Sequence, residues 1–210
     1  MMSNGITLLE PSSAEIVEKK SRFIAVAEPV SSEAEALAVI ERERKKHRDA
    51  RHVCSAYYLD NGRTVRANDD GEPSGTAGIP ILDLIKKRGL TDVVITVTRY
   101  FGGILLGAPG LVRAYSASAK AALDCAALGR YSTVAHMLCV CEYKDFDKLK
   151  YLLETMNADN ITPEFAENVA VSFVCNEADS EAIALKISET FSKRLNAEML
   201  GLSDELVPLK

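Results

Sequence analysis

Residues 92–100, Asp-Val-Val-Ile-Thr-Val-Thr-Arg-Tyr, form the clearest strand pattern in the chain. The run from Val93 to Val97 holds β-branched residues without the polar alternation of a half-exposed strand. Such a run is typical of a strand that is buried on both faces. The stretch therefore predicts the middle strand of a sheet.

The segments around this strand predict a mixed α/β domain. Apolar residues between 14 and 30 are broken by a charged turn at 18–22, which predicts two strands or one long irregular strand. Ser31 and Ser32 precede two glutamates and predict a helix start, because a serine hydroxyl can cap free N–H groups. Further elements are predicted as strands at 52–59 and 64–66, joined by an Asn-Gly turn, and as helices at 79–88 and 111–128.

The second part of the chain predicts a different fold. Its patterns predict, in order, a strand at 132–142, a helix at 146–156, strands at 161–165 and 169–175, a helix at 180–195 and a strand at 198–206. This is the order of a ferredoxin-like α+β sandwich. We therefore predict two α+β domains, residues 1–130 and 131–210.

The net charge of −5 hides two unlike halves. Residues 1–130 carry 18 basic and 16 acidic side chains, whereas residues 131–210 carry 7 and 14. The first half therefore has a formal charge of +2 and the second a formal charge of −7. Only the first half is expected to contact a polyanion.

Composition and patterning exclude several classes of protein. With 47% hydrophobic and 26% charged residues in a length of 210, the chain is neither collagen nor a disordered tail. No run approaches the ~18 apolar residues of a membrane span, and the opening nine residues are too short for the apolar core of a signal peptide. Five cysteines without a C-x-x-C pair argue against a disulfide framework. We expect a cytoplasmic protein without membrane contact.

A loop at 68–78 gathers oxygen-rich side chains. Asp69, Asp70 and Glu72 place three carboxylates within four residues, beside Ser74 and Thr76. These groups could bind a hard cation such as Mg²⁺ or hold basic side chains in place. The alternative is turn chemistry, with Ser74 or Thr76 capping the following helix. We favour turn chemistry and predict no metal site.

A second glycine-rich loop, residues 99–110, leads from the central strand into a helix. Free N–H groups and the dipole at a helix N-terminus favour an anion, and Arg99 and Arg113 could add charge-assisted contacts. The loop has neither the Gly-Lys-Ser/Thr of a P-loop nor a G-x-G-x-x-G dinucleotide pattern. The alternative is close packing that only glycine permits, with Arg99 paired to a carboxylate of the first loop. The glycines in question are Gly102, Gly103 and Gly107.

Two further features complete the candidate set. His52 is a further candidate for ligand or RNA binding and shares a strand face with Cys54. Without a second cysteine pair at zinc spacing, we predict neither a metal site nor thiol catalysis there, and ordinary packing is the alternative. The stretch 42–51 has the highest local density of basic side chains and is either a solvated helix end or a contact for RNA. Its basic residues are Arg42, Arg44, Lys45, Lys46, Arg48 and Arg51.

Several motifs of the sequence together resemble those of one family. The run Asp69-Asp70-Gly71-Glu72-Pro73-Ser74-Gly75-Thr76-Ala77-Gly78, followed by Val97-Thr98-Arg99-Tyr100-Phe101-Gly102-Gly103 and Leu111-Val112-Arg113-Ala114-Tyr115-Ser116, resembles the IMPACT family in its bacterial YigZ-like branch. Lys20-Ser21-Arg22-Phe23-Ile24 and His52-x-Cys54 look like other hallmarks of the family. One departure is Pro109, where the family pattern leads us to expect glycine.

The resemblance has implications for fold and function. It implies a first domain with the fold of domain IV of elongation factor G and a ferredoxin-like second domain similar to domain V of that factor. It also implies a link to translation, because the eukaryotic IMPACT relatives regulate translation.

We therefore predict a non-catalytic cytosolic binding protein linked to translation. Its first domain would contact RNA or the ribosome through Arg99, Arg113 and the 42–51 stretch, and a protein partner in translation is also expected. The alternative is an enzyme or a small-molecule binder for an anion or phosphate, with a cleft between the 69–78 and 99–110 loops. We predict no cofactor and assign no catalytic residue.

Overall fold

The computed structural model describes residues 5–209, which divide into two compact units. The first unit comprises residues 5–131 and 206–209, and the second comprises residues 132–205. The predicted domain limits, 1–130 and 131–210, differ from these units at the end of the chain. There the N–H of Leu209 donates to the carbonyl of Leu128 at 2.9 Å, so residues 206–209 pack with the first unit. Residues 1–4 and 210 lie outside the described residues.

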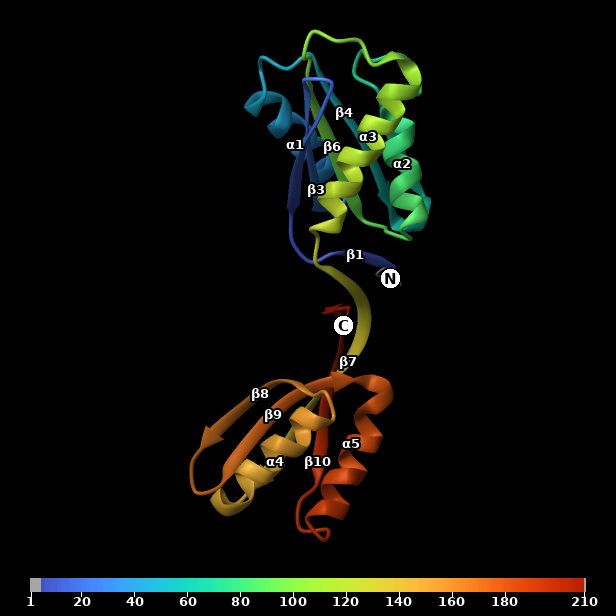
Figure 1. The fold of residues 1–210 in the computed structure, drawn as a ribbon. Coiled ribbons are helices and arrows are strands. Elements are labelled where there is room, and N and C mark those ends of the chain that lie inside the picture. The colour runs from blue at the N-terminus through green and yellow to red at the C-terminus, as the bar shows by residue number, and fades with distance from the viewer. Residues whose placement is uncertain (1–4, 210) are drawn as a thin grey trace. The chain divides into compact units, whose positions relative to one another are not determined.

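An antiparallel five-stranded sheet forms the first unit, in the order β2-β3-β6-β4-β5 (Figure 1). The stretch 92–100 is confirmed as the middle strand, and the break at 18–22 separates two strands. The bounds are β2 (Ser12–Glu18), β3 (Ser21–Pro29), β4 (His52–Leu59), β5 (Thr64–Asn68) and β6 (Val93–Tyr100), with a short 3₁₀ turn, η1 (Asp60–Gly62), between β4 and β5.

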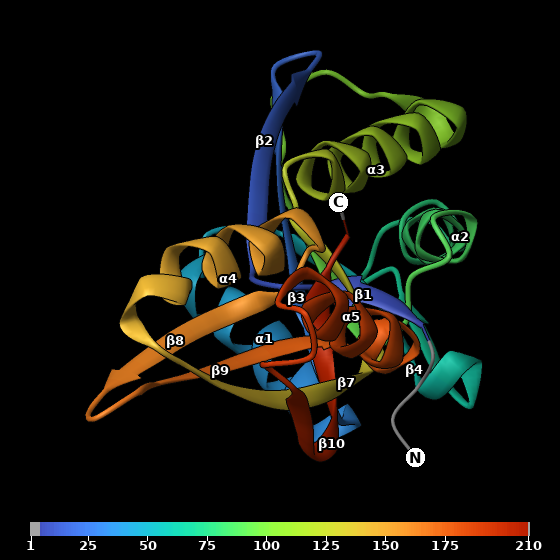
Figure 2. The same cartoon turned by 90° about the horizontal axis from the view of Figure 1, so that it is seen from below.

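Helices cover both faces of this sheet, which explains why β6 is buried at almost every position. On one face, α2 (Gly78–Lys87) and α3 (Gly107–Asp124) pack on a core that includes Ile95 and Val97. On the other face, α1 (Glu33–Lys46) packs where Val94 is buried. Figure 2 shows α2 and α3 side by side and α1 apart from them. Because successive side chains of a strand point to opposite faces, a doubly covered strand buries all of them.

Local sequence sets the helix ends. The hydroxyl of Ser32 accepts a hydrogen bond from the N–H of Glu35 at 3.3 Å and caps α1, as predicted. Gly89 follows α2 with φ of +65°, the left-handed conformation that glycine adopts readily. The helix predicted from residue 111 begins four residues earlier, at Gly107, because Pro109 suits the first turn of a helix. It also ends earlier than predicted, at Asp124.

The turn between β2 and β3 holds two lysines in a strained backbone. Glu18 pairs with Ser21 across a two-residue loop, and Lys19 and Lys20 have φ of 46° and 67°. Such loops need positive φ at both positions, which glycine and asparagine adopt at lower cost. Gly102 lies against this turn, because a Cβ built there would be 2.0 Å from the carbonyl carbon of Lys20.

The second unit has the ferredoxin-like order that was predicted. Its sheet runs β10-β7-β9-β8, which is the order 4-1-3-2 along the chain, and buried residues of β7 and β9 form a core with both helices. The elements are β7 (Leu128–Cys141), α4 (Tyr143–Thr155), β8 (Asp159–Phe165), β9 (Val169–Asn176), α5 (Glu177–Thr190) and β10 (Ala197–Pro208). The first residues of β7 belong to the first unit, where β1 (Ile6–Leu8) pairs with Leu128–Arg130. Across residues 5–209, no helix is long and apolar enough to cross a membrane.

Candidate functional site

The carboxylate of Asp69 organises the loop before α2. It accepts hydrogen bonds from the N–H groups of Gly75 at 2.8 Å, Ala77 at 3.0 Å and Gly78 at 2.8 Å. The last two groups lie at the N-terminus of α2, so Asp69 caps this helix from across the loop. The predicted caps, Ser74 and Thr76, do not fill this role: the hydroxyl of Thr76 donates to the carbonyl of Pro73 at 2.6 Å, and Ser74 is exposed.

These bonds predict an acid-sensitive loop. Burial raises the pKa of Asp69, but the N–H groups of Gly75, Gly78 and Ala77 outweigh it and hold the pKa below its ordinary 3.8. A carboxylate with a lowered folded-state pKa stabilises the fold above the unfolded pKa and loses that effect as the pH falls through the folded value.

We expect Asp69→Ala to lower the free energy of unfolding of the first unit by about 1–2 kcal/mol at pH 7. Melting curves should show that the difference in stability between the variant and the unmodified protein becomes smaller below pH 3.8. Asp83→Ala, on an exposed position of α2, serves as the matched control and should stay within about 0.5 kcal/mol. A gap of constant size down to pH 2 would contradict the assignment.

Asp70 and the start of β4 hold the same loop in place. The Asp70 carboxylate accepts from the N–H of Val53 at 2.7 Å and from Arg44 Nη2 at 2.5 Å. Nδ1 of His52 lies 2.7 Å from the Asp70 carbonyl oxygen, and the Cys54 thiol donates to the Asp69 carbonyl at 3.0 Å. His52 and Cys54 therefore use their shared strand face to bind loop backbone. Burial raises the pKa of Cys54 to about 12, so this thiol stays protonated at neutral pH.

A buried charge pair joins the two glycine-rich loops. Arg99 Nη1 donates to Glu72 Oε1 at 2.7 Å, and the Tyr115 hydroxyl donates to the same oxygen at 2.8 Å. Arg99 is 7% exposed and Glu72 is 8% exposed. The Arg99 guanidinium lies 5.5 Å from the ring centre of Phe23 and 5.6 Å from that of Phe101. The structure contains the pairing of Arg99 with a loop carboxylate that was considered from sequence, whereas an anion contact at Arg99 stays a prediction.

The three carboxylates of the first loop do not converge. Asp69 binds backbone N–H groups, Asp70 binds Val53 and Arg44, and Glu72 binds Arg99 and Tyr115. Within the described part of the chain, no group of three His, Cys, Asp or Glu side chains is placed to hold a metal ion.

Carboxylates neutralise most of the basic stretch at 42–51. Four of its six cations have partners: Arg42 pairs with Glu28 and Glu43, Arg44 with Asp70, Lys45 with Glu41 and Lys46 with Glu43. Arg48 and Arg51 have no ion pair among residues 5–209. The charge available to a polyanion is therefore concentrated at the end of the stretch.

Strand register brings several other groups to the same end of the sheet. Arg22 pairs with Tyr100, and His52 pairs with Arg99, so the β2–β3 turn, the start of β4 and the loop after β6 are neighbours. We call this surface the loop end; it lies at the top of the first unit in Figure 1. We define it by eight exposed residues: Lys19, Lys20, Arg48, Arg51, Phe101, Ile104, Leu105 and Arg113.

The loop end combines free positive charge with exposed apolar surface. None of its five cations forms an ion pair with any residue that the structure describes. Its apolar members are well exposed, at 46% for Phe101, 42% for Ile104 and 82% for Leu105. Sequence reasoning missed five members of the loop end as site residues: Lys19, Lys20, Phe101, Ile104 and Leu105. The available signal was the apolar content of a loop rich in glycine, Phe-Gly-Gly-Ile-Leu-Leu at 101–106.

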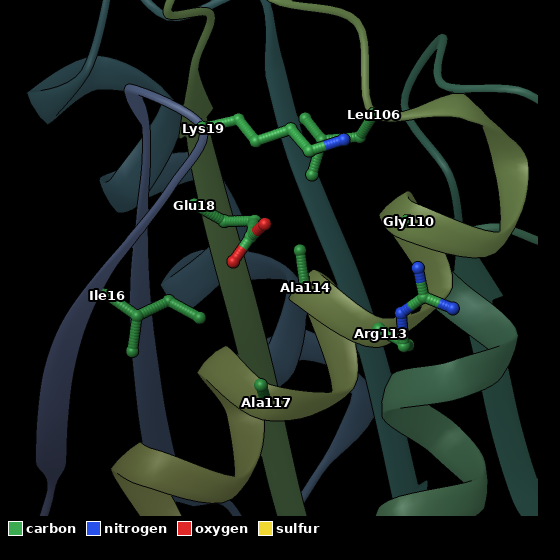
Figure 3. A pocket seen from close by; sticks show the side chains of 8 residues that line it. All are labelled: Ile16, Glu18, Lys19, Leu106, Gly110, Arg113, Ala114 and Ala117. Atoms are coloured by element: carbon green, nitrogen blue, oxygen red, sulfur yellow. The ribbon is translucent and has the colours of Figure 1, made fainter.

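The two arginines that were predicted to act together, Arg99 and Arg113, line different pockets. A pocket of about 190 Å³ is lined by Arg51, His52, Arg99, Phe101 and Leu105. A second, of about 210 Å³, lies between the β2–β3 turn and α3 and includes Arg113. Figure 3 shows Glu18 and Lys19 reaching from the turn toward α3, which supplies Arg113, Ala114 and Ala117.

The three predicted glycines have different roles. Gly102 donates its N–H to the Ser21 hydroxyl at 3.1 Å and permits the close approach to Lys20. Gly103 and Gly107 have φ of +83° and +71° and open space around the Cα position, so conformation and not crowding favours glycine there.

These features define a two-unit α/β protein whose first unit carries a cationic and apolar loop end. Residues 19–123 match the Impact N-terminal domain, and residues 139–194 match a domain of unknown function, DUF1949. The chain is 38% identical over 190 residues to IMPACT family member YvyE of Bacillus subtilis, covering 90% of this chain and 88% of the relative. It is 32% identical over 174 residues to IMPACT family member YigZ of Escherichia coli, covering 81% and 85%.

A solved structure is similar over the whole length. The crystal structure of a hypothetical protein matches 100% of this chain and 99% of its own chain, with 28% identity and a TM-score of 0.60. The chain belongs to the IMPACT family, and both of its domains have counterparts there.

Proposed function

We propose that this chain is a non-catalytic binding protein that acts in the regulation of translation and contacts RNA or the ribosome through its first unit. Membership of the IMPACT family supports the link to translation, since the eukaryotic relatives regulate it. The observation that carries the RNA contact is the loop end, where five cations without ion pairs surround exposed apolar side chains. Free Lys and Arg side chains attract phosphates, and exposed aromatic groups stack on bases.

We place the contact on the loop end and not on the paired cations of α1. Arg42, Arg44, Lys45 and Lys46 each have a carboxylate partner that phosphate would have to displace. Lys19, Lys20, Arg48, Arg51 and Arg113 meet no such competition within residues 5–209. The acidic second unit is expected to stay away from RNA.

The salt dependence of binding tests this proposal. A variant with Lys19, Lys20, Arg51 and Arg113 each changed to glutamine should bind RNA more weakly. The slope of log affinity against log salt should fall by up to about 3, because each lost phosphate contact to a single strand removes about 0.7. Fluorescence anisotropy of a labelled RNA across a salt series measures both quantities.

A matched variant removes the same number of charges elsewhere on the first unit. Arg63, Arg66, Lys86 and Lys87, which are exposed on β5, the turn before it and the last turn of α2, are changed to glutamine. Its slope should match that of the unmodified protein. Equal slopes for both variants, or no RNA binding by the unmodified protein, would overturn the proposal.

A small anionic ligand is the second candidate. The observation that favours it is the pocket beside Arg51 and Arg99, whose volume of about 190 Å³ is large enough for a phosphate group. A nucleotide or phosphorylated metabolite that alone raises the melting temperature, at concentrations well above its affinity, would favour this candidate.

A further inference from the structure

The pocket at Arg99 is built from segments that the fold brings together. It is lined by Arg51 and His52 at the start of β4, by Arg99 at the end of β6, and by Phe101 and Leu105 in the following loop. His52 and Arg99 are paired across neighbouring strands, so the sheet fixes the backbone positions of these two lining residues. Its volume, about 190 Å³, is below the ~300–1,000 Å³ of pockets for drug-sized ligands, so it suits a phosphate with part of a sugar.

Arg99 is a buried and incompletely satisfied donor in this pocket. Its Nη1 donates to Glu72, but its Nε is buried and has no hydrogen-bond partner among residues 5–209. Buried donors without an acceptor are rare in native proteins and point to a missing partner. Glu72 and the rings of Phe23 and Phe101 hold the guanidinium in position, which prepares it to meet an anion.

The charge of the pocket matches a single phosphodiester. Glu72 balances the charge of Arg99, whereas Arg51 is exposed and has no ion pair within the described residues. Arg51, Arg99 and Glu72 together sum to one positive charge. No carboxylate is among the lining residues within the described part of the chain, and the carboxylate of Glu72 is paired with Arg99.

Phe101 adds a surface for a base next to this charge. Its ring is 46% exposed although it contacts the Arg99 guanidinium, and Leu105 beside it is 82% exposed. An aromatic ring beside a cationic recess is typical of proteins that bind single strands, because an unstacked base can lie on the ring. The bases of a duplex are stacked inside the helix and cannot reach it.

Building on the proposed RNA contact, we propose that this pocket binds one nucleotide of single-stranded RNA. The phosphate lies between Arg51 and Arg99, and the base stacks on Phe101. The same chemistry occurs in a free nucleoside monophosphate, so the experiment includes both sources.

The test compares single-stranded and double-stranded RNA by fluorescence anisotropy at one salt concentration. Phe101→Ala should weaken binding of a short unstructured RNA by about tenfold and leave binding of a duplex within about twofold, because stacking on an aromatic side chain contributes a factor of about that size per base. Phe101→Tyr keeps the ring and should bind within about twofold of the unmodified protein. Leu37→Ala, an exposed position of α1 outside the pocket, is the matched control.

A second pair of variants tests the phosphate. Arg51→Gln should weaken binding of the single strand, whereas Arg63→Gln should not. Arg63 is also exposed, but it lies in the turn between β4 and β5, at the opposite end of β4. Arg51 is a surface residue, so its variant is informative even where a change at Phe101 impairs folding.

The outcomes separate this inference from the proposed function. RNA binding that prefers a duplex, or that is equal for Phe101→Ala and Leu37→Ala, overturns the single-strand site but leaves the RNA contact. If the unmodified protein does not bind RNA, both the single-strand site and the proposed RNA contact are wrong. Adenosine monophosphate is the probe for a free nucleotide. If it displaces the RNA, binds more tightly than the RNA and loses affinity in Phe101→Ala, the pocket binds a free nucleotide and the proposal of an RNA ligand is wrong.

Discussion

Glu72→Ala is expected to destabilise the first unit by about 3–5 kcal/mol, because it leaves the buried Arg99 guanidinium without its counter-charge. The side chains of Arg99 and Glu72 are 8% and 4% exposed, so the change leaves a charge that is largely removed from water. The change also removes the acceptor of the Tyr115 hydroxyl. A buried donor that loses its acceptor adds its own desolvation cost.

Amide hydrogen exchange of β6 measures this loss within the first unit alone. Exchange at residues 93–100 should accelerate by about two to three and a half orders of magnitude, given that each 1.4 kcal/mol corresponds to a factor of ten. The second unit does not contribute to this readout.

Two further variants separate charge from packing. The double variant Glu72→Met, Arg99→Met removes both charges and should recover much of the stability, since replacing a buried pair by apolar residues is often neutral. Glu41→Ala, which breaks the exposed pair with Lys45, should cost less than about 1 kcal/mol. Exchange rates for Glu72→Ala that resemble those for Glu41→Ala would show that the buried pair does not stabilise the unit.

The parts of the fold that sequence predicted are those that depend on local patterns. The β-branched run at 93–97 identified the central strand because burial on both faces leaves no polar alternation. Ser32 identified the start of α1 because its cap is local. The start of α3 was misplaced, since the glycines at 107 and 110 suggested a loop although Pro109 fits a first turn.

Contacts between distant segments limited the prediction of the site. Asp69 caps α2 although it lies nine residues before Gly78, the first residue of the helix. Capping patterns in sequence relate residues only a few positions apart, so they could not identify it. The density of cations at 42–51 favoured that stretch as a polyanion contact, but Glu28 and Asp70, brought in by the fold, pair with two of them. Whether a cation is free depends on such partners, which are not visible in the local sequence. Lys19 and Lys20 were overlooked for this reason.

Gly102→Ala is expected to destabilise the first unit by about 2–3 kcal/mol and to displace the β2–β3 turn. The added Cβ would lie 2.0 Å from the carbonyl carbon of Lys20, 2.1 Å from its oxygen and 2.4 Å from the nitrogen of Ser21. These are backbone atoms, which cannot rotate away as a side chain can. Because both strands beside the turn are paired in the sheet, the clash has to move the turn itself.

Two other glycines separate crowding from backbone strain. Gly103 has open space but a φ of +83°, so Gly103→Ala should cost about 1–2 kcal/mol through conformation alone. Gly201 has open space and no left-handed φ, so Gly201→Ala should stay within about 0.5 kcal/mol. Hydrogen exchange of β3 and β6 measures the loss of stability for Gly102→Ala and Gly103→Ala, and hydrogen exchange of β10 measures it for Gly201→Ala. A cost for Gly102→Ala no greater than that for Gly103→Ala would mean that the turn yields easily. In that case the strained lysines at 19 and 20 would not be held by this contact, and their placement at the loop end would need another cause.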